Sequence, residues 1–558
     1  MIKKIGIENF RVFKEYTEFN LAPITVLTGT NNSGKSSFTK FLDLLSSNLK
    51  KPAGFSVLDF IKGNHQLGEF SNIINWDSNS DKLSFELDFP LSYFDENFKI
   101  QLKYSSFQEN GVLHSFKIYN KKRTLLDVFE IESNYESDGK GMHMSRNNDK
   151  VHLSYKLDVN YIKETINTFK GDDKNTKSLL LKYQSDNEII NSDNINLLYS
   201  LEALIFNNEE VYISLFSNKN ENHLINFFNK SVDDSEWNIF DLENLSSELD
   251  LQIQEMELFE SVLSENDWNE KYANLNITYV HVSSVTAEIF DEIFTNNIYK
   301  GLQSLNKQFS SFSFLSATRG SKDRIFLNDS NYEINLLIRE FNKFVNIGSF
   351  YFTFLEKALI ILGIKGTLKI KRVESFGTLL YVEQKNRDVL LSDLGYGFSQ
   401  VIPILLKILI ESEKIYRSRD DLRSVEENIN WEEITKKIYP TITIEEPEAN
   451  LHPKLQSKLA DVFVLAYKTF GVHFIIETHS EYLIRKLQYL TAKKEIVQDD
   501  VFIYYFNEEE YVTDKESKVK EIKIDQFGGL TDSFGPGFFD EATSLKFELM
   551  KLNQAQNN

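Results

Sequence analysis

Residues 29–37 read GTNNSGKSS, and this stretch determines how the rest of the sequence is interpreted. It contains the pattern G-x-x-x-x-G-K-S and lies between an apolar, strand-like segment at 24–28 and a segment with helical spacing at 36–45. Glycines allow backbone N–H groups to close around phosphate oxygens, and the N-terminus of a helix favours a bound anion. The stretch therefore predicts a loop, between a strand and a helix, that binds the phosphates of a nucleotide.

The side chains of this loop indicate which cofactors it takes. Lys35 is expected to reach the β- and γ-phosphates of ATP, and Ser36 is expected to ligate Mg²⁺. The residues expected to contact the nucleotide are Asn32, Ser33, Gly34, Lys35, Ser36 and Ser37. ATP and Mg²⁺ are therefore the predicted cofactors.

A second apolar strand, far along the chain, ends in two carboxylates. Residues 441–448 read TITIEEPE, with Glu445 and Glu446 directly after the apolar run. Beside a phosphate loop, Glu445 would help to hold Mg²⁺, and Glu446 would orient or deprotonate the attacking water as the catalytic base. Neighbouring strand residues face opposite ways, so spacing alone does not establish this geometry. An acidic turn without a catalytic role is the alternative interpretation.

Two further motifs lie where a strand ends or a helix begins. His479 follows the apolar strand at 473–478, where it is predicted to touch the γ-phosphate, although a lone histidine is more often a surface or core residue. Residues 391–400 read LSDLGYGFSQ and precede a long apolar helix. Such a turn presents N–H groups and hydroxyls to an anion at a helix N-terminus. A loop that uses its two glycines only for turn geometry is the alternative.

Composition excludes several classes of protein. The net charge of −21 argues against a protein that coats nucleic acid with its whole surface, because phosphate contacts need clustered Lys and Arg. The absence of cysteine excludes disulfides, thiolate zinc sites and thiol catalysis. Pro403 and Lys407 interrupt the longest apolar run, at 401–410, which is too short to cross a bilayer. We therefore expect a cytoplasmic protein without a membrane partner.

Periodicity predicts an α/β fold. Residues 2–27 alternate apolar and polar side chains as a β-hairpin does, and residues 82–104 alternate as antiparallel strands do. After residue 310, strands and helices alternate in a way that is typical of a parallel sheet covered by helices. The expected division is 1–95 for the first part of the nucleotide-binding unit, 96–310 for an insertion, and 311–558 for the second part of that unit.

The expected insertion contains an unusual acidic segment. Residues 231–270 hold thirteen Asp and Glu and no Lys or Arg. Leu242, Leu249, Met256 and Leu263 recur there every seven residues, which predicts a helix with an apolar stripe. This helix either packs on its own domain with a solvated acidic face or docks a partner protein.

Together, these motifs resemble the ABC-type ATPase heads of SMC and RecF proteins. The resemblance is closer to the overcoming-lysogenization-defect (OLD) ATPases and their relatives in bacterial anti-phage defence. It covers about 1–95 and 310–558. The stretches that carry it are IENFRVFKEYTEFNL (7–21), LGEF (67–70), FLSATRGSKDR (314–324), DLGYGFSQVIPIL (393–405), EEPEANLHP (445–453), ETHSEYL (477–483) and GPGFFDE (535–541). The implied fold is an ABC-ATPase head, with a mixed sheet and flanking helices, that carries a large α+β insertion domain.

The resemblance implies roles for further residues. Arg11 would help to hold the nucleotide, and Gln66 would be the glutamine that senses Mg²⁺. Arg319 would contact phosphate or form a structural ion pair, and Asn450 stands where many relatives carry histidine. Ser392, Gly395 and Gly397 would form the signature that closes on ATP bound by a second subunit.

The resemblance also implies partners. Two copies would sandwich two ATP molecules, in a homodimer or a higher oligomer, so that ATP binding drives association and hydrolysis reverses it. The strand before Glu446 would lie beside the phosphate loop. The segment after His479 shows no nuclease motif, and only nine histidines are scattered over the chain.

The effector is therefore expected to be a separate protein. By analogy with Septu-type and retron systems, it would be an HNH-type nuclease, and nucleic acid would be contacted through the complex. An SMC- or RecF-like ATPase that clamps DNA directly is the alternative, and Lys and Arg in 362–374 would supply a small basic patch. A transporter subunit would need a surface that couples to membrane helices, and the insertion does not have that character.

Overall fold

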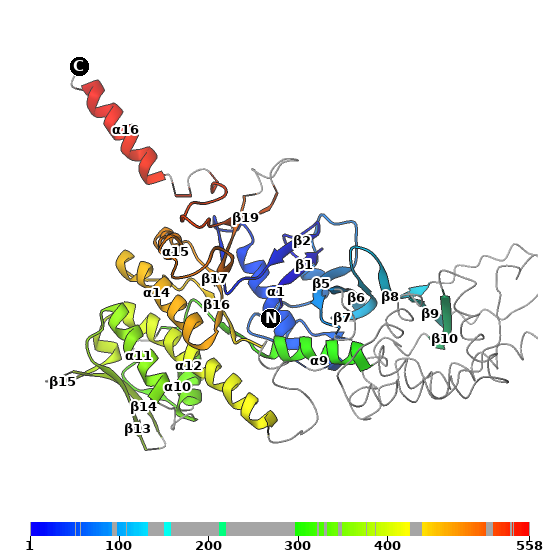
Figure 1. The fold of residues 1–558 in the computed structure, drawn as a ribbon, viewed down its shortest axis with the longest axis horizontal. Coiled ribbons are helices and arrows are strands. Elements are labelled where there is room, and N and C mark those ends of the chain that lie inside the picture. Colours follow the sequence, from blue (N-terminus) through cyan, green and yellow to red (C-terminus); the bar gives the residue numbers. More distant parts are fainter. Residues whose placement is uncertain are drawn as a thin grey trace, which may run out of the picture.

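The fold is known from a computed structural model, which describes residues 2–131, 150–157, 211–218, 296–423 and 438–556 (Figure 1). Short gaps inside these ranges lie at 51, 56, 92–96, 108, 321–322, 329–331, 344–348, 375, 385–386, 509–516, 536–537 and 540. The predicted acidic helix at 231–270 lies outside the described residues. The described residues form three sheets and the helices that cover them.

The first sheet is antiparallel and has nine strands in the order β10-β9-β8-β7-β6-β5-β1-β2, with β4 paired to β7. The bounds are β1 (Lys4–Glu8), β2 (Thr17–Asn20), β4 (Val57–Leu58), β5 (Leu83–Phe89), β6 (Phe98–Phe107), β7 (Asn110–Tyr119), β8 (Thr124–Ile131), β9 (Lys150–Leu157) and β10 (Val211–Asn218). In β5 the apolar residues alternate, and Phe85 and Leu87 pair with Leu102 and Ile100 of β6 on the core face. Alternation at 82–104 therefore predicted these two strands correctly.

This sheet crosses the boundary expected between residues 95 and 96. Strands β5 and β6 lie on either side of that position and pair over their whole length. The sheet that begins at residue 4 thus continues through β10, which ends at Asn218. The described strands from β6 to β10, which follow position 96, therefore extend the first sheet.

The second sheet has six strands in the order β11-β16-β17-β3-β18-β19. The bounds are β3 (Ile24–Gly29), β11 (Phe312–Leu315), β16 (Thr441–Glu445), β17 (His473–Glu477), β18 (Val501–Phe506) and β19 (Val519–Lys523). All neighbours are parallel except β18 and β19. The parallel sheet predicted for the second half of the chain is therefore confirmed, and one strand of the first half, β3, lies inside it.

Two predictions from the sequence are corrected by this arrangement. Ile24 and Val26 were assigned to a hairpin with the first strand, but that hairpin consists of β1 and β2 alone. All six residues of β3 are buried, so alternation carries no information about the sheet to which it belongs. In addition, the strand before Glu446 does not lie beside the phosphate loop, because β17 lies between β16 and β3.

Helices cover both faces of the parallel sheet (Figure 1). Their bounds are α1 (Lys35–Asn48), α9 (Asn296–Ser310), α10 (Glu333–Lys343), α11 (Ser349–Leu362), α12 (Tyr396–Arg423), α14 (Pro453–Phe470), α15 (Glu481–Ala492) and α16 (Glu541–Gln556). One core cluster joins α1 and α9 to the nine-stranded sheet and to one face of the parallel sheet. A second joins α11, α12, α14 and α15 to its other face. The parallel sheet therefore separates two cores.

The third sheet is small and antiparallel. It has the order β12-β14-β13, and β15 pairs with β14. The bounds are β12 (Phe326–Leu327), β13 (Thr367–Val373), β14 (Gly377–Gln384) and β15 (Arg387–Leu390). Short 3-10 helices lie at Pro52–Phe55, Phe70–Asn72, Leu391–Asp393 and Gln498–Asp500. Together with α10 and α11, this sheet forms the lobe from which the signature stretch at 391–400 leads into α12 (Figure 1).

The last helix, α16, extends away from the rest of the molecule (Figure 1). Five of its large apolar side chains are half or more exposed: Leu545, Phe547, Leu549, Met550 and Leu552. None of the described helices is long and apolar enough to cross a membrane.

Candidate functional site

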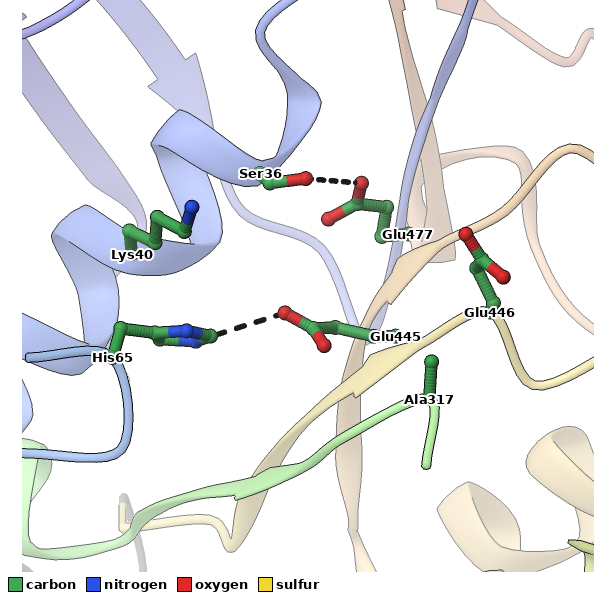
Figure 2. Close-up of a pocket in the computed structure, with 7 residues that line it drawn as sticks. All are labelled: Ser36, Lys40, His65, Ala317, Glu445, Glu446 and Glu477. Carbon is green, nitrogen blue, oxygen red and sulfur yellow. Dashed lines mark hydrogen bonds and ion pairs between the residues drawn. The ribbon is translucent and has the colours of Figure 1, made fainter. Parts of the chain in front are cut away.

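A pocket of about 310 Å³ lies where strands β3, β16 and β17 end (Figure 2). These strands are parallel, so their C-terminal ends meet at one edge of the sheet. The residues that line the pocket are Ser36, Lys40, His65, Ala317, Glu445, Glu446 and Glu477. Ligands bind at this edge of open parallel sheets because backbone and side-chain groups converge there.

The phosphate loop has the backbone conformation that its sequence requires. Gly34 caps α1 with a φ of 107°, a conformation that residues with a side chain rarely adopt. A Cβ at this position would also meet Val12 Cγ2 at 2.5 Å. The loop is thus closed by a glycine-dependent turn packed against the segment that carries Arg11, and the N-terminus of α1 faces the loop as an anion site requires.

Lys35 is folded back on its own loop. Its Nζ donates to the carbonyl oxygens of Thr30 at 2.6 Å and Gly29 at 3.2 Å. Burial lowers the pKa of the Lys35 ammonium, and the nearby carboxylate of Glu477 opposes this effect. The Thr30 hydroxyl has no hydrogen-bond partner among the described residues although it is buried. The loop therefore carries the Lys35 ammonium and the Thr30 hydroxyl, two groups that could bind a phosphate.

Ser36, the predicted metal ligand, donates a hydrogen bond from Oγ to Glu477 Oε1 at 2.7 Å (Figure 2). Glu477 ends β17 and is 6% exposed. Sequence analysis assigned it no role, although it immediately precedes Thr478-His479 and ends the apolar strand next to β3. An acidic residue at the end of a buried strand was the available signal, and the same signal had identified Glu445.

Glu445 points toward His65 rather than toward Ser36 (Figure 2). His65 Nε2 lies 3.6 Å from Glu445 Oε1, a contact too long for a hydrogen bond. Asp43 on α1 fixes the histidine, because its carboxylate accepts from the backbone N–H groups of Asn64 and His65 at 2.7 and 3.0 Å. Burial lowers the pKa of His65, which favours a neutral imidazole.

Gln66, the predicted Mg²⁺ sensor, is exposed and is absent from the pocket lining. Its neighbour His65 lines the pocket instead. Gln66 has a φ of 30°, so the chain turns sharply between the two residues. The predicted position was one residue away from the side chain that faces the carboxylates.

Glu446 leaves the sheet immediately after Glu445, and the two side chains diverge (Figure 2). The backbone of Glu446 has a φ of 41°, and its N–H donates to the carbonyl oxygen of Glu477 at 2.8 Å. A non-glycine residue in this region is strained by roughly 1–3 kcal/mol and persists only where its surroundings hold it. The exposed carboxylate of Glu446 is thus aimed by its backbone rather than by side-chain contacts.

The carboxylates of this pocket are set up to accept a cation. Burial raises the pKa of Glu445, and Glu446 adds to the increase. Burial likewise raises the pKa of Glu477, which the hydrogen bond from Ser36 partly offsets. A divalent cation would reverse both shifts.

The described residues contain no cluster of three or more metal-ligating side chains that would hold a metal by itself. Mg²⁺ is usually bound through one or two carboxylates, water and substrate phosphates. Ser36, Glu445 and Glu477 are the residues present that could contribute.

His479 lies two residues after the end of β17, close to the predicted strand end, but it does not line the pocket. Its backbone N–H donates to Glu448 Oε1 at 2.6 Å. Burial and the Lys35 charge lower the pKa of His479, so its imidazole is neutral at neutral pH. The electrostatic contact with Lys35 places this imidazole near the phosphate loop.

Arg11 has an unsatisfied guanidinium group. In the described part of the chain, its buried Nε has no hydrogen-bond partner, and burial lowers the pKa of the group. The backbone holds the residue firmly, because its N–H donates to Ile73 O at 2.7 Å and its φ is 50°. A buried donor without an acceptor is costly, so this arrangement fits a residue that receives an anionic ligand.

Arg319 forms no ion pair with any of the residues that the structure describes, and the pocket lining does not include it. It is fully buried and donates to four backbone carbonyls: Ser316, Gln400, Glu445 and Glu446, at 2.8–3.1 Å. Burial lowers its pKa to about 10, so it stays charged at neutral pH. Arg319 therefore joins the turn after β16 to the start of α12.

Ser392, Gly395 and Gly397 lie outside the pocket of their own chain. Gly395 has a φ of 96°, is exposed, and a Cβ there would meet nothing within 4 Å. Gly397 is close to the turn after Glu446, because its Cβ would lie 3.6 Å from the Asn450 carbonyl oxygen. The signature thus presents an open surface next to the turn that carries Glu446.

Comparison with protein families gives two matches. The family described as "AAA ATPase domain" matches residues 1–484, which include the pocket and the signature. The family described as "Protein of unknown function (DUF3696)" matches residues 496–549, from the start of β18 into α16. No curated protein matches the chain.

The solved structures that resemble this chain share little sequence with it. The Smc head domain with an extended coiled coil, bound to the C-terminal domain of ScpA and derived from Pyrococcus furiosus, is 12% identical with a TM-score of 0.31. The match covers 98% of this chain and 99% of that one. The SMC head domain from Thermotoga maritima is 10% identical with a TM-score of 0.31, over 94% of this chain and 99% of that one.

Proposed function

Because the chain belongs to the AAA ATPase domain family, we propose that it binds and hydrolyses ATP with Mg²⁺ as an ABC-type ATPase. The observation that carries this proposal is a single pocket. The phosphate-loop residue Ser36 lines it together with Glu445, Glu446 and Glu477. Carboxylates beside a phosphate loop are the groups that phosphoryl transfer to water requires.

Each residue has a distinct part in the proposed reaction. Lys35 would leave the carbonyl oxygens of Gly29 and Thr30 and bind phosphate oxygens, and Arg11 would add a second cation. Bound Mg²⁺ would supply neutralisation of the phosphate charge. Ser36 and Glu445 would hold that ion. Glu446 would orient the attacking water and take its proton, because its carboxylate is exposed toward the pocket.

We propose that the active form is a homodimer or a larger oligomer in which the signature of one copy closes on ATP bound by the other. Ser392 and Gly395 are absent from the pocket of their own chain, and Gly395 is exposed with open space around it, which supports contact with a second copy. His479 would then contact the γ-phosphate. ATP held between two copies would favour their association, because it would bind the closed dimer better than the open state.

The biological role follows from the resemblance of the motifs to defence ATPases. We propose a regulatory or sensor subunit of an anti-phage complex that controls a separate effector, with an HNH-type nuclease as the expected partner. A pull-down with Glu446→Gln and ATP from the native host, followed by mass spectrometry, tests this role. Recovery of the protein alone with DNA would contradict it.

The enzymatic part is tested with paired variants. Glu446→Gln should keep ATP affinity within a few-fold but slow single-turnover hydrolysis by roughly 10²- to 10⁴-fold, because it removes only the proton acceptor. Lys35→Ala should instead lose ATP affinity. Normal hydrolysis by Glu446→Gln would show that another group is the base.

Direct DNA clamping is the second candidate, and the exposed face of β13 favours it. Lys369 and Lys371 project from this strand, next to the exposed Arg372. Glu383 lies 3.6 Å from Lys369 and partly neutralises the patch. A gel shift at graded salt separates the candidates, because a clamp should lose affinity steeply as salt rises.

A further inference from the structure

We propose that Glu477 is the positioning residue that prepares Ser36 for Mg²⁺. The inference rests on the proposed ATPase function and assigns a residue that neither the sequence motifs nor the family match identifies. Glu477 accepts a hydrogen bond from the Ser36 hydroxyl and so leaves the oxygen lone pairs free to face the cation.

The geometry of the two side chains carries the proposal. Strand β17 is the direct neighbour of β3, so Glu477 ends beside the loop that leads into α1. Ser36 Oγ lies 2.7 Å from Glu477 Oε1 (Figure 2). Thr39 Oγ1 lies 3.5 Å from Oε2. Both carboxylate oxygens therefore face the first turn of α1.

The chemistry of a hydroxyl explains why this contact matters. A serine hydroxyl has one proton and two lone pairs, and only a lone pair can bind a cation. When the hydroxyl donates its hydrogen bond to a buried carboxylate, the lone pairs are left on the opposite side. Partners of this kind orient metal ligands and raise their basicity.

Glu445 does not offer this contact in the structure. Its Oε1 faces His65 at 3.6 Å, and β17 separates its strand from β3. The two carboxylates thus have different contacts: Glu445 lies against His65, and Glu477 accepts the hydrogen bond of Ser36.

The side chain of Glu477 can be tested separately from its backbone. The carbonyl oxygen of Glu477 accepts from Glu446 N–H at 2.8 Å, and a substitution leaves that bond in place. Glu477→Ala removes the acceptor for Ser36, whereas Glu477→Gln removes the charge but keeps an acceptor oxygen of similar reach.

The experiment measures ATP affinity by calorimetry, with Mg²⁺ and with EDTA, for the full chain and its variants. In Glu477→Ala the Mg²⁺-dependent gain in affinity should fall by roughly 10- to 100-fold, as for other partners of metal ligands, while affinity in EDTA stays unchanged. Glu477→Gln should retain most of the gain. Ser36→Ala should lose the Mg²⁺-dependent gain in ATP affinity. The double variant Ser36→Ala/Glu477→Ala should bind ATP with the same affinity as Ser36→Ala alone.

The outcomes separate this inference from the proposed function. Wild-type protein that binds ATP equally with Mg²⁺ and with EDTA would overturn the metal-dependent function itself. A normal gain in Glu477→Ala, or an equal loss of affinity with and without Mg²⁺, would overturn the inference alone. If Glu477→Ala does not fold, Glu477→Gln decides: a retained gain supports the role as an acceptor, and a lost gain overturns it.

Discussion

Arg319 is a single residue on which two functional segments depend, and its replacement should be costly. In Arg319→Lys the ammonium cannot reach four carbonyls, which leaves those of Glu445 and Glu446 without a donor. We expect the apparent free energy of unfolding to fall by about 3 kcal/mol, since each unsatisfied buried group costs roughly 1–3 kcal/mol. Urea unfolding measures this change.

Arg324→Lys is the matched control for this variant. Arg324 is 68% exposed, and its ion pair with Asp393 at 2.9 Å lies on the surface. Such pairs contribute roughly 0–1 kcal/mol, so this substitution should be nearly neutral. Equal effects of the two variants would contradict the role assigned to Arg319.

His473 predicts how stability depends on pH. The ring is buried between Tyr439 and Tyr467, and this burial lowers its pKa to about 4. The histidine therefore stabilises the fold fully above pH 6.5, its ordinary pKa, and this contribution is lost as pH falls toward 4. When the pH is lowered from 7.5 to 5.5, the free energy of unfolding should fall by roughly 1 kcal/mol less in His473→Phe than in the wild type.

Chemical denaturation at both pH values measures this difference. A parallel pH dependence in wild type and His473→Phe would show that the ring is already protonated in the folded protein at pH 5.5.

At the residue scale, the sequence predicted the groups that belong to a contiguous pattern and missed those set by the sheet. Lys35, Ser36 and Glu446 follow from motifs. Glu477 and His65 do not, because their relation to Ser36 and Glu445 depends on strand order and on the turn at 63–66. Arg319 was expected to contact phosphate or to form an ion pair, but in the structure it is buried and binds backbone carbonyls.

At the scale of elements, strands and helices with a clear period agree with the sequence. The segment with helical spacing at 36–45 is α1, which continues to Asn48, and the strand expected at 473–478 is β17, which ends at Glu477. Strand β3 was placed in the wrong sheet, because a strand buried on both faces has no alternation to show its partners.

The C-terminal helix α16 should not be needed for the stability of the rest of the fold. Its large apolar side chains are exposed, so deletion from residue 541 removes little buried surface. We expect the midpoint of thermal unfolding to stay within about 2 °C, since a change of 1 kcal/mol shifts a large domain by roughly 2–4 °C. Differential scanning fluorimetry measures the midpoint.

Deletion from residue 534 is the contrasting variant. It also removes Phe534, Phe538 and Phe539, which pack against one another, while Phe534 and Phe538 also pack against Tyr505 of β18. This larger deletion should lower the midpoint clearly, because it uncovers apolar surface beside β3. A similar loss in both variants would mean that α16 stabilises the body.

At the scale of the whole molecule, the proposed sandwich requires that each active site use two copies. Lys35→Ala has a defective phosphate loop, and Gly395→Asp has a defective signature. Aspartate tolerates the φ of 96° better than most residues, and open space surrounds the position. Each variant alone should be inactive.

An equal mixture of the two variants should recover roughly a quarter of wild-type ATP hydrolysis, because half of the random dimers would contain one intact site out of two. Coupled-enzyme assay of mixed and separate samples measures this recovery. If mixing restores nothing although sedimentation shows mixed dimers, the signature does not act on a second copy.

The position of β3 between β17 and β18 has a consequence for synthesis on the ribosome. Both neighbours of this strand lie beyond residue 470, so β3 waits without its sheet partners until most of the 558 residues have been translated. At bacterial speeds this wait lasts on the order of half a minute, during which an apolar strand is unpaired. A prematurely terminated chain would therefore leave no partial enzyme, only an aggregation-prone fragment for chaperones and proteases to remove.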